Sequence, residues 1–91
     1  MSAPPWRLVV SAGAERDLNR LPEKSAPAMV EFMLGPLLEN PHRVGHALRG
    51  RLAGRFSARR GGYRIIYALD EAAGVVRVIA IRPRADAYRL G

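Results

Sequence analysis

The chain of 91 residues contains no cysteine, a single lysine and only two histidines. Without cysteine there is neither a disulfide nor a thiolate metal site, which suits a reducing cytoplasm. The apolar run near the N-terminus, Leu8 to Val10, is too short for the core of a signal peptide. No stretch approaches the length that crosses a bilayer. We therefore predict a cytoplasmic protein that has no contact with a membrane.

Several catalytic motifs are also missing. There is no G-x-x-x-x-G-K-[ST] phosphate loop, no H-E-x-x-H zinc helix and no G-x-S-x-G nucleophile turn. His42 and His46 have the spacing of a helical metal site, but Pro41 and Gly45 argue against a regular helix there. We therefore expect neither a metal nor a cofactor.

Arginine is abundant instead, and its charge lies in one half of the chain. Residues 1–45 hold five basic and five acidic side chains, whereas residues 46–91 hold ten basic and three acidic ones. The second half therefore carries the whole net charge of +7. A GC-rich genome would favour arginine over lysine, but base composition does not sort charges between halves. This asymmetry predicts a surface that faces a polyanion.

The patterning predicts one α+β domain over residues 1–91, in the order β-α-α-β-β-β with a short C-terminal helix. A strand is expected over 6–10, followed by a helix over 12–21 that Ser11 caps. A second helix is expected over 23–38, bent at Gly35-Pro36. The two apolar helices need one face of an antiparallel sheet to cover, which leaves the other face free for arginine.

The second half of the chain supplies that sheet. Residues 41–54 contain three glycines and no clear period, which predicts a loop with a short strand near 47–52. Strands are expected over 55–60, 63–69 and 75–81, because β-branched and aromatic residues gather there. Gly61-Gly62 is expected to supply the positive φ angles of a two-residue hairpin turn. A terminal helix is expected over 85–90.

Arg64 stands on a strand otherwise built of Tyr and Ile. Alternation places it on one face with Ile66, and Tyr63, Ile65 and Tyr67 on the other. A charge in that position either pairs with a carboxylate or faces a cleft. The carboxylates nearby in sequence are those of Asp70, Glu71 and Asp86. The alternative is a phosphate held by the planar guanidinium.

A second basic group follows the last strand. Arg82 and Arg84 stand at its exit, and Tyr88 comes six residues after Arg82. A tyrosine beside several guanidiniums can stack on a base or donate a hydrogen bond. It can equally anchor a terminal helix through its amphipathic ring. Both readings of Tyr88 are open from the residues alone.

Four segments together resemble the RelE-type toxins of bacterial type II toxin–antitoxin systems. They are RLPEK, LLENPHRVGHALRG, RRGGYRIIY and IRPRADAY, and they extend over nearly the whole chain. The strand motif G-x-Y-R-[IVL]-[IVL]-Y is shared by the whole RelE/ParE superfamily. The spacing of Arg82 and Tyr88 is more typical of the RNA-cleaving RelE branch than of the ParE-like gyrase inhibitors.

The resemblance implies a metal-independent endoribonuclease, an mRNA interferase that cleaves mRNA in the ribosomal A site and inhibits translation. The ribose 2′-hydroxyl would attack the adjacent phosphorus. Arg64 matches the arginine that holds the scissile phosphate, and Arg82 the one that assists the leaving 5′-oxygen. Tyr88 matches the tyrosine that orients the reacting nucleotide. Arg55 and Ser57 stand where well-known members have lysines.

The two departures at lysine positions bear on the mechanism. Arg55 is a good anion clamp and a poor general base, because arginine keeps its proton at physiological pH. Ser57 cannot replace a charge, and we expect it, with Arg59, Arg60 and Arg84, to contact RNA or ribosome. No histidine is well placed in the predicted fold. Electrostatic stabilisation of the phosphorane is therefore the expected strategy.

The resemblance also implies partners. They are the ribosome with its mRNA, and a cognate antitoxin that is acidic and wraps the toxin with its C-terminal segment. Two other activities stay open on the same fold. The chain can be a ParE-like inhibitor of DNA gyrase, or a catalytically inactive member that binds its antitoxin and regulates the operon. Ser57, at a position where well-known members have a lysine, is the feature that supports the inactive alternative.

Overall fold

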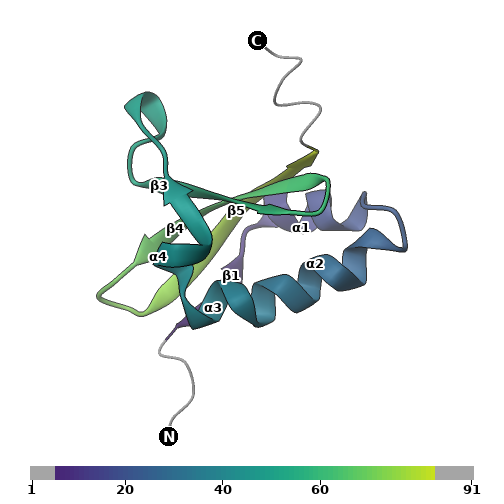
Figure 1. Ribbon diagram of the computed structural model, residues 1–91, viewed down its shortest axis with the longest axis horizontal. Coiled ribbons are helices and arrows are strands. Elements are labelled where there is room, and N and C mark those ends of the chain that lie inside the picture. Colours follow the sequence, from purple (N-terminus) through teal and green to yellow (C-terminus); the bar gives the residue numbers. More distant parts are fainter. Residues whose placement is uncertain (1–5, 84–91) are drawn as a thin grey trace, which may run out of the picture.

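The computed structural model describes residues 6–83, which form a small α+β domain (Figure 1). In chain order, the elements are β1 (Arg7–Val10), α1 (Ala12–Asn19), α2 (Ser25–Leu34), α3 (Pro36–Glu39), α4 (Pro41–Val44), β2 (Gly45–Ala47), the 3-10 turn η1 (Gly50–Leu52), β3 (Arg55–Arg60), β4 (Tyr63–Asp70) and β5 (Val75–Pro83). The predicted fold class is confirmed. The predicted terminal helix over 85–90 lies outside the described residues.

One five-stranded sheet forms the centre of the domain, in the order β1-β5-β4-β3-β2. Strands β3, β4 and β5 pair antiparallel, as predicted, and β2 extends this sheet antiparallel to β3. The first strand, β1, lies parallel to β5, with Arg7 opposite Val75. The sheet is therefore mixed rather than purely antiparallel. Its last strand is an interior strand with a neighbour on each side.

The helices begin and end close to the predicted places. The Ser11 hydroxyl accepts the Ala14 amide at 3.0 Å and donates to the Ile79 carbonyl at 3.1 Å, so it caps α1 and ties it to β5. The expected bend at Gly35-Pro36 is confirmed, because Gly35 separates α2 from α3. Within residues 6–83 no helix is long and apolar enough to cross a membrane.

The segment 41–54 was predicted wrongly in two respects. Its first four residues form α4, which starts at Pro41, a residue that fits the first turn of a helix. The short strand is Gly45–Ala47, ahead of the expected 47–52, and residues 50–52 form the turn η1.

The hairpin turn at Gly61-Gly62 is present, but only Gly61 has a positive φ, at 61°, where two were expected. A single positive φ at the first turn position is typical of a type II′ hairpin.

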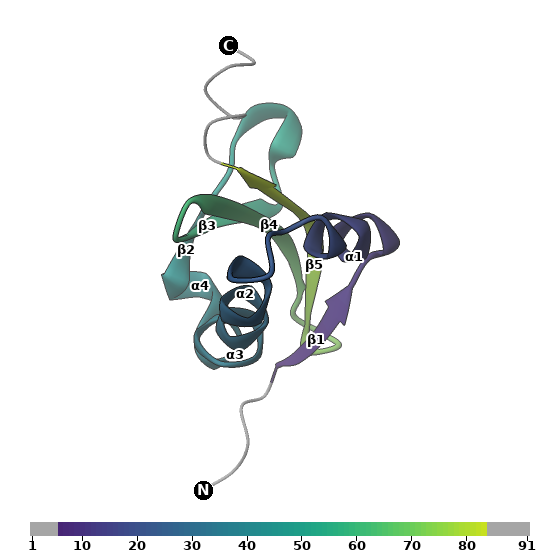
Figure 2. The same ribbon diagram turned by 90° about the vertical axis from the view of Figure 1, so that its right-hand side faces the viewer.

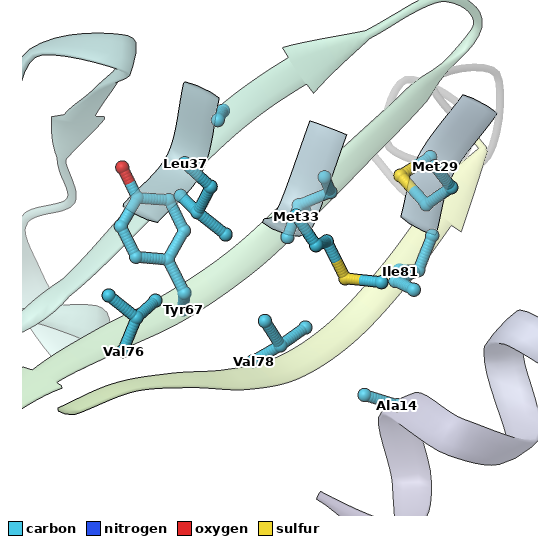
Figure 3. Packing of buried hydrophobic residues seen from close by; sticks show 10 residues of the cluster. Ala14, Met29, Met33, Leu37, Tyr67, Val76, Val78 and Ile81 are labelled. Carbon is cyan, nitrogen blue, oxygen red and sulfur yellow. The ribbon is translucent and has the colours of Figure 1, made fainter. Parts of the chain in front are cut away.

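The hydrophobic core lies between one face of the sheet and the helices. Figure 3 shows Met29, Met33 and Leu37 of α2 and α3 above the side chains of β4 and β5. Residues of the strands that are buried against them are Ala58, Ile65, Tyr67, Val76, Val78 and Ile81. Figures 1 and 2 show α2 and α3 on this side, while the turn that carries η1 extends away from them. The opposite face of the sheet is not covered by a helix of residues 6–83.

Candidate functional site

Three arginines form a row across the uncovered face of the sheet. Arg64 of β4 lies directly opposite Arg59 of β3 on one side and Arg82 of β5 on the other. Directly opposed residues share a face, and Ile65, the next residue of β4, is buried in the core. The row therefore points away from α2 and α3. With strands about 4.8 Å apart, its Cα atoms span about 10 Å. We call these three residues the arginine row.

Carboxylates of residues 6–83 neutralise little of the charge of the arginine row. Like charges directly opposite one another destabilise a sheet. A bound anion would reduce the repulsion between these three arginines. In the described part of the chain only Arg82 approaches a carboxylate, with Nη1 3.7 Å from Asp17 Oδ1, and its side chain is 57% exposed. Two of the three carboxylates considered as partners of Arg64 are used elsewhere: Asp70 accepts the Ala73 amide and Glu71 pairs with His42. Asp86 lies outside the described residues.

Within residues 6–83, one polar atom of this row and one next to it are buried without a hydrogen-bond partner. They are Arg64 Nε and Ser57 Oγ, and the Ser57 residue is only 1% exposed. Ser57 lies opposite Ile66, so it is the diagonal neighbour of Arg64 on the same face. A buried donor without a partner costs about 1–3 kcal/mol, which a bound polar group can recover. These two atoms make the centre of the face a candidate binding position.

The other predicted site residues are placed less centrally. Arg55 lies on the same face opposite Ala68, but four residues from Arg59, which is about 13 Å along a strand. Arg60 opposes Tyr63 and so belongs to the helix side, where it lines a hollow with Gly61 and Gly62. Arg84 and Tyr88 lie outside the described residues. The structure therefore brings Ser57, Arg59, Arg64 and Arg82 together, without Arg55 or Arg60.

Two residues of this face were missed by the sequence analysis. Arg77 opposes Ala68 from β5, on the same face as Arg55. The pattern V-V-R-V could have revealed it, because one polar residue within an apolar strand marks the solvent side. His46, assigned to a loop above, lies on β2 directly opposite Ser57. Its place depends on the register of β2 with β3, which no local pattern encodes.

Tyr67 of β4 lies on the helix side of the sheet, opposite the uncovered face. It is fully buried, and its hydroxyl donates to the Pro41 carbonyl at 2.6 Å. Burial raises the pKa of the Tyr67 phenol to about 12, because the charged form would lose its hydration. Phe56 stacks on the Tyr67 ring at 5.5 Å between centroids. These contacts hold α4 and the start of β2 against β4.

A second feature is an apolar groove between α1 and α2, of about 900 Å³. Its lining includes Leu18 and Leu21 on one side and Val30 and Leu34 on the other. Leu34 is 58% exposed and adds apolar surface to the groove. Glu23 and Glu31 stand at its rim. An apolar groove of this shape fits the apolar face of a helix.

Comparison with known proteins places the chain in a family. A family model described as "ParE toxin of type II toxin-antitoxin system, parDE" matches residues 8–88. Toxin RelE of Mycobacterium tuberculosis is 52% identical over 86 residues, which is 94% of this chain and 89% of that protein. Toxin RelG of the same organism is 45% identical over 85 residues, covering 93% and 98% of the two chains.

Solved structures agree with the sequence comparison. The toxin–antitoxin complex RelBE2 from Mycobacterium tuberculosis contains a chain that superposes with a TM-score of 0.85 at 42% identity, covering 88% of this chain and 99% of that one. The isolated E. coli RelE toxin has a TM-score of 0.69 at 20% identity, over 93% and 97% of the two chains, and so shares the fold. The chain therefore belongs to the ParE toxin family of the RelE/ParE superfamily, whose members are toxins of type II toxin–antitoxin systems.

Proposed function

We propose that the protein is a metal-independent endoribonuclease that cleaves mRNA in the ribosomal A site. The observation that carries this proposal is the arginine row, in which Arg64 Nε and the neighbouring Ser57 Oγ are buried without a hydrogen-bond partner among residues 6–83. A planar guanidinium binds phosphate through two donors at once. Similarity to proteins named RelE and RelG supports this branch of the superfamily. Translation would stop because the message is cut, which places the action in the cytoplasm.

The chemistry needs charge stabilisation more than it needs a nucleophile from the protein. The ribose 2′-oxygen attacks the adjacent phosphorus, and the bond to the 5′-oxygen of the next nucleotide breaks. Arg64 lies at the middle of the arginine row and would bind the scissile phosphate as negative charge builds on it. Arg82 would stabilise the leaving 5′-oxygen, Arg59 would hold an RNA phosphate, and Tyr88 would orient the nucleotide.

Substitution of the arginine row tests this proposal. We expect Arg64→Ala and Arg82→Ala each to lower the rate of cleavage on mRNA-programmed ribosomes by about a hundredfold or more. Primer extension on the mRNA gives the cut position and the rate. Arg16→Ala, which removes one charge from the helix α1, is the matched control and should cleave normally. A 2′-deoxynucleotide at the cut position should block the wild-type protein. Normal cleavage by both row variants would overturn the site assignment.

One observation favours a second candidate, a gyrase inhibitor, because the matching family model bears the ParE name. A supercoiling assay with purified gyrase, run beside the cleavage assay, separates the two activities. We expect supercoiling to be unaffected. If supercoiling is inhibited while the mRNA stays intact, the protein is a gyrase inhibitor and not a ribonuclease. If neither assay responds, the protein would be an inactive, antitoxin-binding regulator.

A cognate antitoxin is the partner that fits the apolar groove between α1 and α2. Relatives of this chain have been solved as toxin–antitoxin complexes, among them the intact E. coli RelBE complex. The groove offers an apolar surface to a helix, and the net charge of +7 favours an acidic segment beyond it. We infer an antitoxin with an apolar helix followed or preceded by an acidic segment.

A further inference from the structure

We infer that His46 is a catalytic residue, the group that takes the proton from the attacking 2′-hydroxyl. This inference rests on the endoribonuclease function proposed above and adds a titrating side chain to a site otherwise built of arginine. Arginine stabilises an anion but does not accept a proton near neutral pH. Histidine is the side chain whose ordinary titration range covers pH 5 to 8.

The register of β2 with β3 places His46 at the site. His46 lies directly opposite Ser57, and Gly45 opposite Ala58. Ala58 is buried in the core, so Gly45 is on the helix side and His46 is on the uncovered face. Directly opposed side chains have Cβ atoms about 5 Å apart. His46 is itself exposed, so its ring is open to a substrate on that face.

Next to His46, two polar atoms of the protein lack hydrogen-bond partners that a substrate could supply. Among residues 6–83, Ser57 Oγ and Arg64 Nε are buried without a hydrogen bond; Ser57 lies directly opposite His46, and Arg64 is the diagonal neighbour of Ser57. A phosphate held by Arg59 and Arg64 would lie two residue pairs, about 7 Å, along the sheet from His46. The adjacent ribose then comes within reach of the imidazole, as a general base requires.

On this face, the charged side chains that strands β3 and β4 place around His46 are all cationic. From β3, Arg55 and Arg59 stand two residues to either side of Ser57, and from β4 Arg64 adds a third. The segments that flank β2 carry Arg43 on α4 and Arg49 and Arg51 near η1. The residue rows through Arg55, Ser57 and Arg59 contain no carboxylate in the described strands. His46 is therefore the proton acceptor that this part of the face offers.

The step balances without any added reagent. The 2′-hydroxyl proton moves to an unprotonated ring nitrogen of His46 while the 2′-oxygen bonds to phosphorus. The bond between phosphorus and the 5′-oxygen breaks, and that oxygen leaves with the electron pair and takes a proton from water. The products are a 2′,3′-cyclic phosphate and a 5′-hydroxyl end. The imidazolium returns its proton to solvent.

The test compares single-turnover cleavage on mRNA-programmed ribosomes by the wild-type protein, His46→Gln and His42→Gln from pH 5.5 to 8.5. Glutamine keeps the size and hydrogen bonding of the side chain but cannot take the proton. We expect His46→Gln to be about a hundredfold slower at neutral pH and to lose the fall in rate on the acid side. His42→Gln, the control, alters the histidine that pairs with Glu71 and should keep both rate and profile.

Each result has a distinct meaning. A His46→Gln variant that cleaves within twofold of the wild type, or that keeps the acid-side fall, would overturn the role of His46 and leave the proposed function standing. A wild-type protein that does not cleave would overturn both. Should glutamine lower the melting temperature, His46→Ala with added imidazole decides. Recovery of the rate supports a proton acceptor, and failure to recover excludes one.

Discussion

Tyr67 couples the stability of the domain to alkaline pH. Its folded-state pKa, about 12, lies above the ordinary value of 10.0, so the unfolded chain loses the phenol proton first. The contribution to stability is present in full below about pH 10 and is lost as the pH rises toward 12. We expect the free energy of unfolding, measured by urea titration, to fall over this interval.

Tyr67→Phe isolates the effect. The variant should be about 1 kcal/mol less stable at pH 7, because the Pro41 carbonyl loses its hydrogen bond. Between about pH 10 and 12, its free energy of unfolding should also fall less than that of the wild type, because no phenol is present at position 67 to ionise. Tyr63→Phe, at the start of the same strand, should keep it. An equal alkaline fall in wild type and Tyr67→Phe would refute the assignment.

Gly45 is the residue at which β2 comes closest to the core. An added Cβ would collide with the Tyr67 hydroxyl and would lie 2.7 Å from the Ser57 carbonyl oxygen. We expect Gly45→Ala to lower the free energy of unfolding by about 1–3 kcal/mol or more, because backbone on the next strand cannot yield. Gly62→Ala is the control, since nothing lies within 4 Å of its added carbon. Equal stability of the two variants in urea would contradict this account.

At the scale of elements, β1 pairs with β5 only as far as Val78, and beyond that point a side chain of α1 binds the β5 backbone. Asp17 Oδ2 accepts the Ile81 amide at 2.9 Å, and Oδ1 faces Arg82. We expect Asp17→Ala to cost about 1–3 kcal/mol of unfolding free energy in urea, because the amide loses its acceptor. Asp17→Asn should cost less, since its amide oxygen can still accept. It should also cleave at least as fast as the wild type, because Arg82 no longer faces a carboxylate.

Elements with a local pattern were predictable, and elements defined by distant pairing were not. Helical spacing with the Ser11 cap predicts α1, and the Gly-Gly turn between β-prone runs predicts the β3–β4 hairpin. Strand β2 has three residues, too few for a pattern, and exists because it pairs with β3. The parallel pairing of β1 with β5 joins residues 68 positions apart, such as Arg7 and Val75.

The candidate site divides in the same way. Alternation along β4 is enough to place Arg64 on the uncovered face, and the register then adds Arg59 and Arg82 beside it. His46 required the register of a short strand that the sequence did not reveal. The roles of all the predicted site residues, Ser57, Arg64 and Arg82 included, stay predictions. So does the extent of the domain over residues 1–91.

At the scale of the whole molecule, the uncovered sheet face and the apolar groove lie on different elements, so the two partners should be separable by mutation. Leu34→Glu places a charge in the groove and should weaken antitoxin binding at least tenfold, about 1.4 kcal/mol, while ribosomal cleavage stays normal. Titration calorimetry with the purified antitoxin gives the affinity. Leu52→Glu, on a leucine that is also exposed but lies on η1, should bind the antitoxin normally. Equal affinity of the two variants would move the antitoxin to another surface.

The position of β5 has a consequence for when the protein becomes active. This strand is an interior strand of the sheet, contacts β1 and β4, and carries Arg82, yet it is the last element of residues 6–83 to be synthesised. Until it emerges from the ribosome, β1 has no neighbour in the sheet and the arginine row lacks its third member. Non-local pairings of this kind form late in folding. Under the proposed function, a nascent chain that still lacks β5 would therefore be unable to act on the ribosome that makes it, because Arg82 and the pairing partner of β1 are both missing.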